Sequence, residues 1–200
     1  MNGIQDPELN GYRAALEANS RDASSLTRNL ELVQMNWTPT EGSWSLSLCL
    51  RHLISTTNAY IPQIDRAIDA GFRRKLHGEG PFRHGWFINR FIRALEPPPT
   101  KKMWGPKIFS PDLTDVEDVV SGFDVSQTEL ISRAQAADGL HLSRVRVASP
   151  ASNFLWMSLG QAFGILAAHQ RRHLWQAHEI RRHPEFPDSA ARRTLTKEYE

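Results

Sequence analysis

The stretch LWMSLGQAFGILAAHQRRHLWQAHEI, residues 155–180, decides the fold that this sequence predicts. At the ~100° per residue of an α-helix, its apolar positions fall into one continuous stripe. The stripe comprises Leu155, Leu159, Ala162, Phe163, Leu166, His169, His173, Ala177 and Ile180. Arg171, Arg172, Glu179 and Arg182 fall on the other side, which we expect solvent to cover. The pattern predicts a long amphipathic helix from Phe154 to about Arg182, with its apolar face in a protein core.

Two members of this stripe, His169 and His173, are histidines one helical turn apart. Burying an unpaired polar group is costly, so two imidazoles in a core need partners. Those partners are either hydrogen-bonding groups or a shared metal ion. Zinc peptidases also use a His-x-x-x-His spacing, but their general base is a glutamate directly after the first histidine. Gln170 occupies that position, which argues against peptidase chemistry.

The same periodicity predicts three more long helices and one short one. The long helices cover residues 8–35, Trp44 to about Ala70, and Asp112 or Thr114 to about Ala137; the short one covers Trp86–Leu95. Ser43 is the expected N-cap of the second long helix, and Pro62 should kink that helix or divide it in two.

The remaining segments contain no convincing strand hairpin. Residues 141–153 are expected to form a loop with a short extended run, and residues 184–200 a polar tail. Four long amphipathic helices without a sheet are typical of a helical bundle. The sequence therefore predicts an all-α four-helix bundle that forms a single domain over residues 1–200.

Composition is that of an ordinary globular protein, and it excludes several classes of site. Hydrophobic residues make up 40% of the 200 residues, and the formal net charge is only +2. Cys49 is the only cysteine, so the chain can form neither an internal disulfide nor a zinc site of several thiolates. Neither a signal peptide nor an apolar stretch of about 18 residues is apparent. We therefore expect a cytoplasmic protein without membrane association.

A third candidate metal ligand, His52, lies in the helix predicted from Trp44 to Ala70. It belongs to a flank of mostly small or polar residues that leaves room beside the apolar seam: Ser45, Cys49, His52, Thr56, Ala59 and Gln63. A histidine pair on one helix and a third histidine on a facing helix can hold a metal ion inside a bundle. Three neutral imidazoles leave one tetrahedral position open, as in catalytic sites, and they suit Zn, Ni, Fe or Cu. Spacing alone leaves hydrogen-bonded core histidines as an alternative.

Two motifs of this sequence resemble those of the DinB family. They are Gly42-x-Trp44-Ser45-Leu46 with Leu50-x-His52-Leu53, and Ala167-Ala168-His169-x-x-x-His173-x-x-Gln176. The resemblance spans about residues 8–183 and implies an up-down four-helix bundle with a long crossover connection, often as a homodimer. It also implies a divalent metal ion, zinc or nickel, held by His52, His169 and His173.

The resemblance leads to a first hypothesis, a metal-dependent enzyme. Characterised relatives include transferases that join low-molecular-weight thiols to electrophiles, and other relatives are described as metal-dependent hydrolases. A small thiol or a water would be activated at the metal, because a dication favours the deprotonated form of its ligand. Cys49 could act as a nucleophile or a fourth ligand, although a small core residue is the simpler interpretation. Gln176 could orient a ligand histidine, and Glu41, Thr56 and Tyr60 are candidate lining residues.

A second hypothesis is a non-catalytic binding module that uses the long basic connection of residues 71–110. Between Arg73 and Lys107 there are nine Lys or Arg residues and two acidic ones, interleaved with Phe82, Trp86, Phe87, Phe91 and Trp104. Basic residues beside aromatic ones suit contacts with phosphates and stacked bases. The small net charge argues against a nucleic-acid partner, and a solvated basic face is the simpler interpretation.

Overall fold

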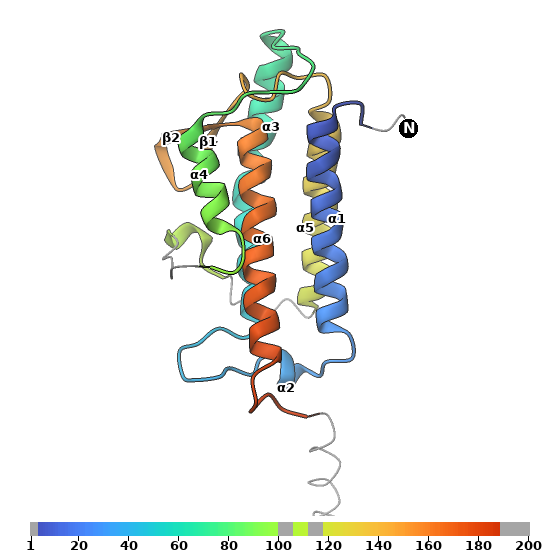
Figure 1. Cartoon of the computed structure of the whole chain (residues 1–200), viewed down its shortest axis with the longest axis vertical. Helices are drawn as coiled ribbons and strands as arrows, with labels where there is room; N and C mark the ends of the chain where they lie inside the picture. Colours follow the sequence, from blue (N-terminus) through green and yellow to red (C-terminus); the bar gives the residue numbers. More distant parts are fainter. Residues whose placement is uncertain (1–3, 100–105, 112–117, 189–200) are drawn as a thin grey trace, which may run out of the picture.

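Four long helices run side by side along the longest axis of the computed structural model, which describes residues 4–99, 106–111 and 118–188 (Figure 1). They are α1 (Pro7–Thr27), α3 (Leu46–Arg73), α5 (Val119–Ala136) and α6 (Leu159–Arg181). Helices α1 and α3 each pack against both α5 and α6, so the four enclose the core, whose buried apolar side chains form two clusters. Phe123 of α5 and Phe163 of α6 are among the largest side chains buried in it. The predicted all-α bundle is confirmed.

The helix predicted over residues 8–35 is in fact two helices. Helix α1 ends at Thr27, and the short helix α2 (Leu32–Met35) follows it. Between them Asn29 adopts a φ of 62°, a left-handed conformation that a continuous helix cannot contain. Helix α1 begins at Pro7, where the Asp6 carboxylate accepts hydrogen bonds from the N–H groups of Glu8 and Leu9.

Helix α3 begins later than predicted. Its N-cap is Ser45, whose hydroxyl accepts a hydrogen bond from the Leu48 N–H at 3.2 Å, so the prediction of Ser43 was wrong. The helix is also not divided at Pro62 but continues to Arg73. Proline has no N–H group, so the Asn58 carbonyl one turn earlier loses its helical hydrogen bond. Pro62 and Asn58 are both exposed, so water can reach that carbonyl instead.

A two-stranded antiparallel hairpin precedes α6, contrary to the prediction that no hairpin is present. It consists of β1 (Arg146–Ser149) and β2 (Ser152–Ser158), with a register irregularity after Ala148. Val147 pairs with Met157, and both side chains are buried, which fastens the hairpin to the core. Residues 154–158 are therefore strand, and α6 begins at Leu159 instead of Phe154. Ser158 caps it in a reciprocal pair of hydrogen bonds with Gln161.

Two predictions fall on residues outside the described ranges. One is the start of the third long helix at Asp112 or Thr114; within the described chain, Asp118 is the N-cap of α5 and accepts from the N–H groups of Val120 and Ser121. The other is most of the polar tail after Pro184.

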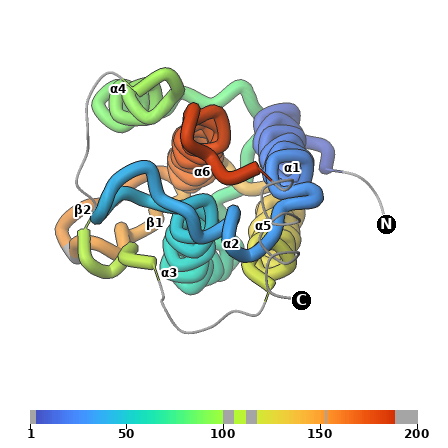
Figure 2. Tube along the Cα trace, turned by 90° about the horizontal axis from the view of Figure 1, so that it is seen from below, coloured from blue at the N-terminus to red at the C-terminus, as the bar shows by residue number. Residues whose placement is uncertain are grey.

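Helix α4 (Trp86–Leu95) has the predicted bounds, and it covers the outer face of α6, as Figure 2 shows along the bundle. All ten residues from Leu159 to Ala168 are consequently buried. For the same reason, the prediction that both Arg171 and Arg172 are solvated was wrong for Arg172, whereas the Arg171 side chain stays 36% exposed. Arg171 forms an ion pair with Glu96, just after α4, and Arg172 is only 9% exposed. The apolar stripe predicted for α6 accounts for only one buried face of that helix. In the structure, α1, α3 and α4 all pack against α6.

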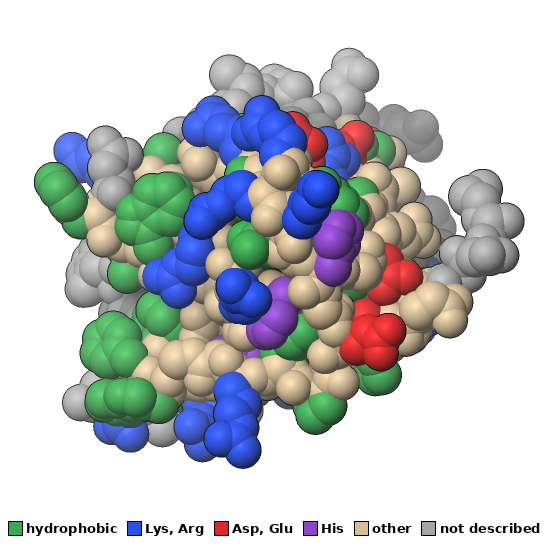
Figure 3. Space-filling model, turned by 90° about the horizontal axis from the view of Figure 1, so that it is seen from above, with side chains coloured by type: hydrophobic (Ala, Val, Ile, Leu, Met, Phe, Trp, Pro, Cys, Tyr) green, Lys and Arg blue, Asp and Glu red, His purple; other side chains and the backbone are tan. Residues whose placement is uncertain are grey.

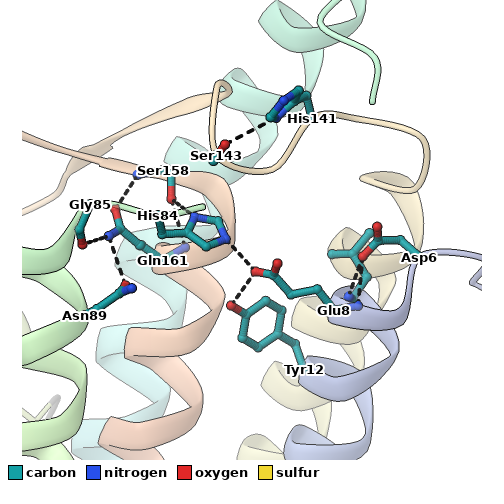
Figure 4. A network of polar contacts seen from close by, with 11 residues as sticks. Asp6, Glu8, Tyr12, His84, Gly85, Asn89, His141, Ser143, Ser158 and Gln161 are labelled. Carbon is teal, nitrogen blue, oxygen red and sulfur yellow. Dashed lines mark hydrogen bonds and ion pairs between the residues drawn. The ribbon is translucent and has the colours of Figure 1, made fainter. Parts of the chain in front are cut away.

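A polar network holds the segment before α4 onto the bundle (Figure 4). His84 lies between the Ser158 hydroxyl and the Glu8 carboxylate, at 2.7 Å from each through its two ring nitrogens. Gln161 donates to the carbonyl of Gly85 at 2.8 Å. A Cβ atom at Gly160 would lie 2.5 Å from the His84 ring, so this close approach requires glycine. The network thereby joins the start of α4 to α1 and α6.

Candidate metal centre

Three histidines that are distant in sequence come together between α3 and α6. They are His52 from α3 and His169 and His173 from α6, and one ligating atom of each lies within 4.8 Å of the others. The Nε2 atoms of His52 and His169 are 3.1 Å apart. The three ring centroids are separated by 4.6 to 4.9 Å. The pairing of α3 with α6 thus brings all three predicted ligands to one place.

Contacts of the ring nitrogens indicate which nitrogen of His52 and of His173 is available to a metal ion. His52 Nδ1 lies 2.5 Å from the Phe109 carbonyl, which follows from the packing of the short 3₁₀-helix η1 (Lys107–Phe109) against α3. His173 Nδ1 lies 3.1 Å from the Gln176 amide oxygen. Because both acceptors are oxygens, each Nδ1 carries the proton and each Nε2 keeps its lone pair. Histidines that bind metals are commonly oriented by such outer contacts.

Burial keeps the three imidazoles neutral. It lowers the pKa of His52, and it lowers the pKa of His169 well below the usual value, with further contributions from His173 and His52. Burial also lowers the pKa of His173 to about 3. Among the described residues, the buried His169 Nδ1 has no hydrogen-bond partner. Neutral imidazole is the form that binds a metal ion, so the donor set fits a divalent cation.

Trp44 completes the wall around the histidines. Its ring stacks on that of His173 with a centroid distance of 5.2 Å and an interplanar angle of 15°. It also meets the edge of His52 at 5.0 Å. The sequence suggested Trp44 only as the start of a helix, and its place eight residues before His52 was the available signal for this role. These ring contacts with Trp44 restrain the His52 and His173 rings before any ligand binds.

A cavity of about 1110 Å³ opens next to the three histidines. Four residues singled out in the sequence line it: Glu41, Thr56, Tyr60 and Gln176. Phe109, Arg172 and Trp175 also line it, and the sequence did not suggest them as lining residues. Cys49 lies instead in the closed core, and burial raises the pKa of its thiol. The interpretation of Cys49 as a small core residue therefore holds over a nucleophile or a ligand.

Gln170, between the two histidines in sequence, belongs to a different site. Its amide oxygen accepts hydrogen bonds from Asn19 at 2.9 Å and from Gln127 at 3.0 Å, and its nitrogen donates to Gln127 at 2.7 Å. These contacts join α6 to α1 and α5, while the histidines face α3. The residue at this position therefore serves the packing of the bundle.

Comparison with known proteins gives one result. A family model described as the DinB superfamily matches residues 15–177, which include all three histidines and well over half of the chain. No match was found among curated proteins or among solved structures. In the described part of the chain, no helix combines the length and the apolar character that a membrane span requires.

Proposed function

The chain belongs to the DinB superfamily, and from this membership we propose that it is a metal-dependent transferase or hydrolase. In this proposal His52, His169 and His173 hold a divalent metal ion, zinc or nickel, and a small thiol or a water is activated there. The observation that carries the proposal is the convergence of three neutral histidines beside a cavity large enough for a small substrate.

When bound, a divalent ion supplies Lewis acidity that favours the deprotonated thiol or water. The protein supplies the rest. The Phe109 carbonyl and Gln176 hold the orientation of the His52 and His173 rings through their Nδ1 atoms. Three histidine ligands leave one coordination position for the reacting group. Trp44 and the three histidines line the cavity, which would give a reacting group access to that position.

Metal content tests the first half of this proposal. Untagged protein is purified and analysed for metals, and we expect about one zinc or nickel ion per chain. His52→Ala and His173→Ala should each abolish it. His178→Ala is the matched control, because His178 also lies on α6 but pairs with Asp22. Wild-type protein that is metal-free, with a melting temperature indifferent to both chelator and added metal, would refute the proposal.

The type of reaction needs a second experiment. Metal-loaded protein is screened with small thiols and electrophiles, and in parallel with ester and amide substrates without a thiol. Thiol conjugation that disappears with His173→Ala supports a transferase, whereas thiol-independent turnover supports a hydrolase. Metal-loaded protein inactive in both screens would count against an enzyme.

One observation favours a second candidate, a binding module built on residues 73–107. Lys and Arg side chains gather at the end of the molecule where α3 ends, beside large apolar side chains (Figure 3). Arg73, Arg74, Lys75 and Arg83 are exposed, and Trp86 and Phe87 are 73% and 66% exposed. A filter-binding assay with single- and double-stranded DNA at about 50 mM salt tests this candidate, since non-specific affinity is greater at low salt. No retention would exclude a nucleic-acid partner.

A further inference from the structure

Six large apolar side chains are exposed on the side of the molecule that carries α4 and the hairpin. They are Trp86, Phe87 and Phe91 on α4, and Phe154, Leu155 and Trp156 on β2. Figures 1 and 2 both place these two elements on the side of α6 that faces away from α1 and α5. Phe154 is 96% exposed, so almost none of its surface contacts the rest of the molecule. An exposed apolar patch of this kind marks a contact with a partner or a membrane.

Arginines accompany these apolar side chains, and acidic residues do not. Residues 83–95 and 144–158 contain no Asp or Glu, but they contain Arg83, Arg90, Arg93, Arg144 and Arg146. All of these arginines are exposed, and among the described residues none forms an ion pair with an acidic side chain. Arg90 follows Trp86 by four residues and Phe87 by three, so the three side chains are neighbours on the surface of α4. Figure 3 shows Lys and Arg side chains between large apolar ones along this edge of the molecule. These arginines and the six apolar side chains form the α4–hairpin face, which complements a partner that is both anionic and apolar.

The composition of the α4–hairpin face argues against two other occupants. A second copy of the chain in a symmetric dimer would place this face against itself. Arginines would then meet arginines, with no carboxylate on the face to offset their repulsion. Nucleic acid would match the charge, but it offers apolar contact mainly through stacking on its bases, which the aliphatic side chain of Leu155 cannot use. A bilayer that contains anionic lipids offers both phosphates at its surface and an apolar interior beneath them.

We propose that the α4–hairpin face docks the protein on the surface of a membrane that contains anionic lipids. Trp86, Phe87 and Phe154 enter the boundary between headgroups and acyl chains, and the arginines pair with lipid phosphates. The contact is peripheral and requires no helix that spans the bilayer. It departs from the expectation drawn from the sequence, which rested on the absence of a long apolar stretch, because only the fold brings the two short elements to one side. The inference goes beyond the proposed function and does not depend on metal binding.

Co-sedimentation of the full chain with lipid vesicles tests the proposal. The protein is mixed at low salt with vesicles of phosphatidylcholine alone, or of phosphatidylcholine and phosphatidylglycerol in equal parts. Wild type should bind only the anionic vesicles, and high salt should weaken this binding. Trp86→Ser combined with Phe154→Ser should lower the partition coefficient by at least about tenfold, and so should Arg83→Gln combined with Arg90→Gln.

Matched control variants change the same kinds of side chain outside the α4–hairpin face. Leu32→Ser combined with Val125→Ser removes two apolar side chains that are 75% and 60% exposed on α2 and α5. Arg21→Gln combined with Arg28→Gln removes two exposed arginines on α1 and at its end. Both control variants should bind anionic vesicles as wild type does. Quenching of tryptophan fluorescence by brominated lipid gives a second measurement, because it requires rings that enter the bilayer.

Each other outcome overturns part or all of the proposal. Wild type that binds neither kind of vesicle, or both equally, overturns it, and retention of DNA without vesicle binding supports a nucleic-acid partner instead. An equal loss of binding in the control variants overturns the assignment to the α4–hairpin face. Binding that depends on the arginines alone, without quenching, overturns the insertion of the aromatic rings. Circular dichroism checks that each variant folds, and if the Trp86 and Phe154 variant does not, Phe154→Ser alone decides the question.

Discussion

The Nε2 atom of His52 lies 3.1 Å from the Nε2 atom of His169, although 117 residues separate them in sequence. In a tetrahedral zinc site, with Zn–N distances of ~2.0–2.1 Å, two ligating nitrogens are about 3.3 Å apart. The packing of α3 against α6 therefore already sets a spacing close to the one that a metal ion requires. An ion held by the three histidines would cross-link the two helices.

This cross-link predicts that metal stabilises the fold. A ligand present at about 100 times its dissociation constant stabilises a protein by about 2.7 kcal/mol. We expect added zinc or nickel to raise the melting temperature of chelated wild-type protein, and His169→Ala to remove the increase. Differential scanning fluorimetry with and without chelator measures both. An equal metal-induced increase in His169→Ala would show that the ion binds elsewhere.

Cys49 should be inert in the native protein. Its side chain is fully buried, and burial raises the pKa of its thiol, so the reactive thiolate is not formed at neutral pH. Because it is the only cysteine, a chromogenic disulfide reagent reports on it alone. We expect negligible reaction at pH 7 and at pH 9, and one thiol per chain after unfolding. Rapid reaction of folded protein at pH 7 would contradict the burial.

Thr57→Val should stabilise the protein. The Thr57 side chain is 1% exposed, and its hydroxyl has no hydrogen-bond partner among the described residues. Removing an unsatisfied buried hydroxyl without changing the shape of the side chain should raise the free energy of unfolding by about 1 kcal/mol. Ser126→Ala is the opposite control, because that buried hydroxyl donates to the Phe123 carbonyl at 2.7 Å and its loss should destabilise. Urea denaturation compares the two, and a loss of stability in Thr57→Val would contradict this account.

Local spacing explains why the helices and the three histidines could be predicted. His169 and His173 are four residues apart, so the sequence alone places them on the same face of a helix. His52 lies on a flank of small or polar residues that recur about once per helical turn. The bounds of α4 were also predictable, because Gly85 precedes it and Pro97 follows it closely. In each case the deciding interactions lie within a few residues along the chain.

The parts that were not predictable depend on contacts between distant segments. Arg172 is buried on the side of α6 that α4 covers, and periodicity within α6 cannot reveal that cover. The partner of His52 is the carbonyl of Phe109, and a backbone carbonyl has no sequence signal. Residues 154–157 are a short apolar run, which fits a helix or a strand equally well until Met157 is paired with Val147.

Gln170 provides the sharpest test of which side of α6 carries the chemistry. Its amide is buried in contacts with Asn19 and Gln127, which join three helices. Gln170→Ala would leave both partners unsatisfied and should cost about 2–4 kcal/mol of stability while leaving the metal content unchanged. Gln170→Glu creates the sequence of the zinc-peptidase motif, with a glutamate directly after His169, but it places a carboxylate among these buried amides. We therefore expect it to destabilise the fold and to confer no hydrolysis of a fluorogenic peptide. Metal-dependent peptide cleavage by Gln170→Glu would show instead that this side chain reaches the histidine site.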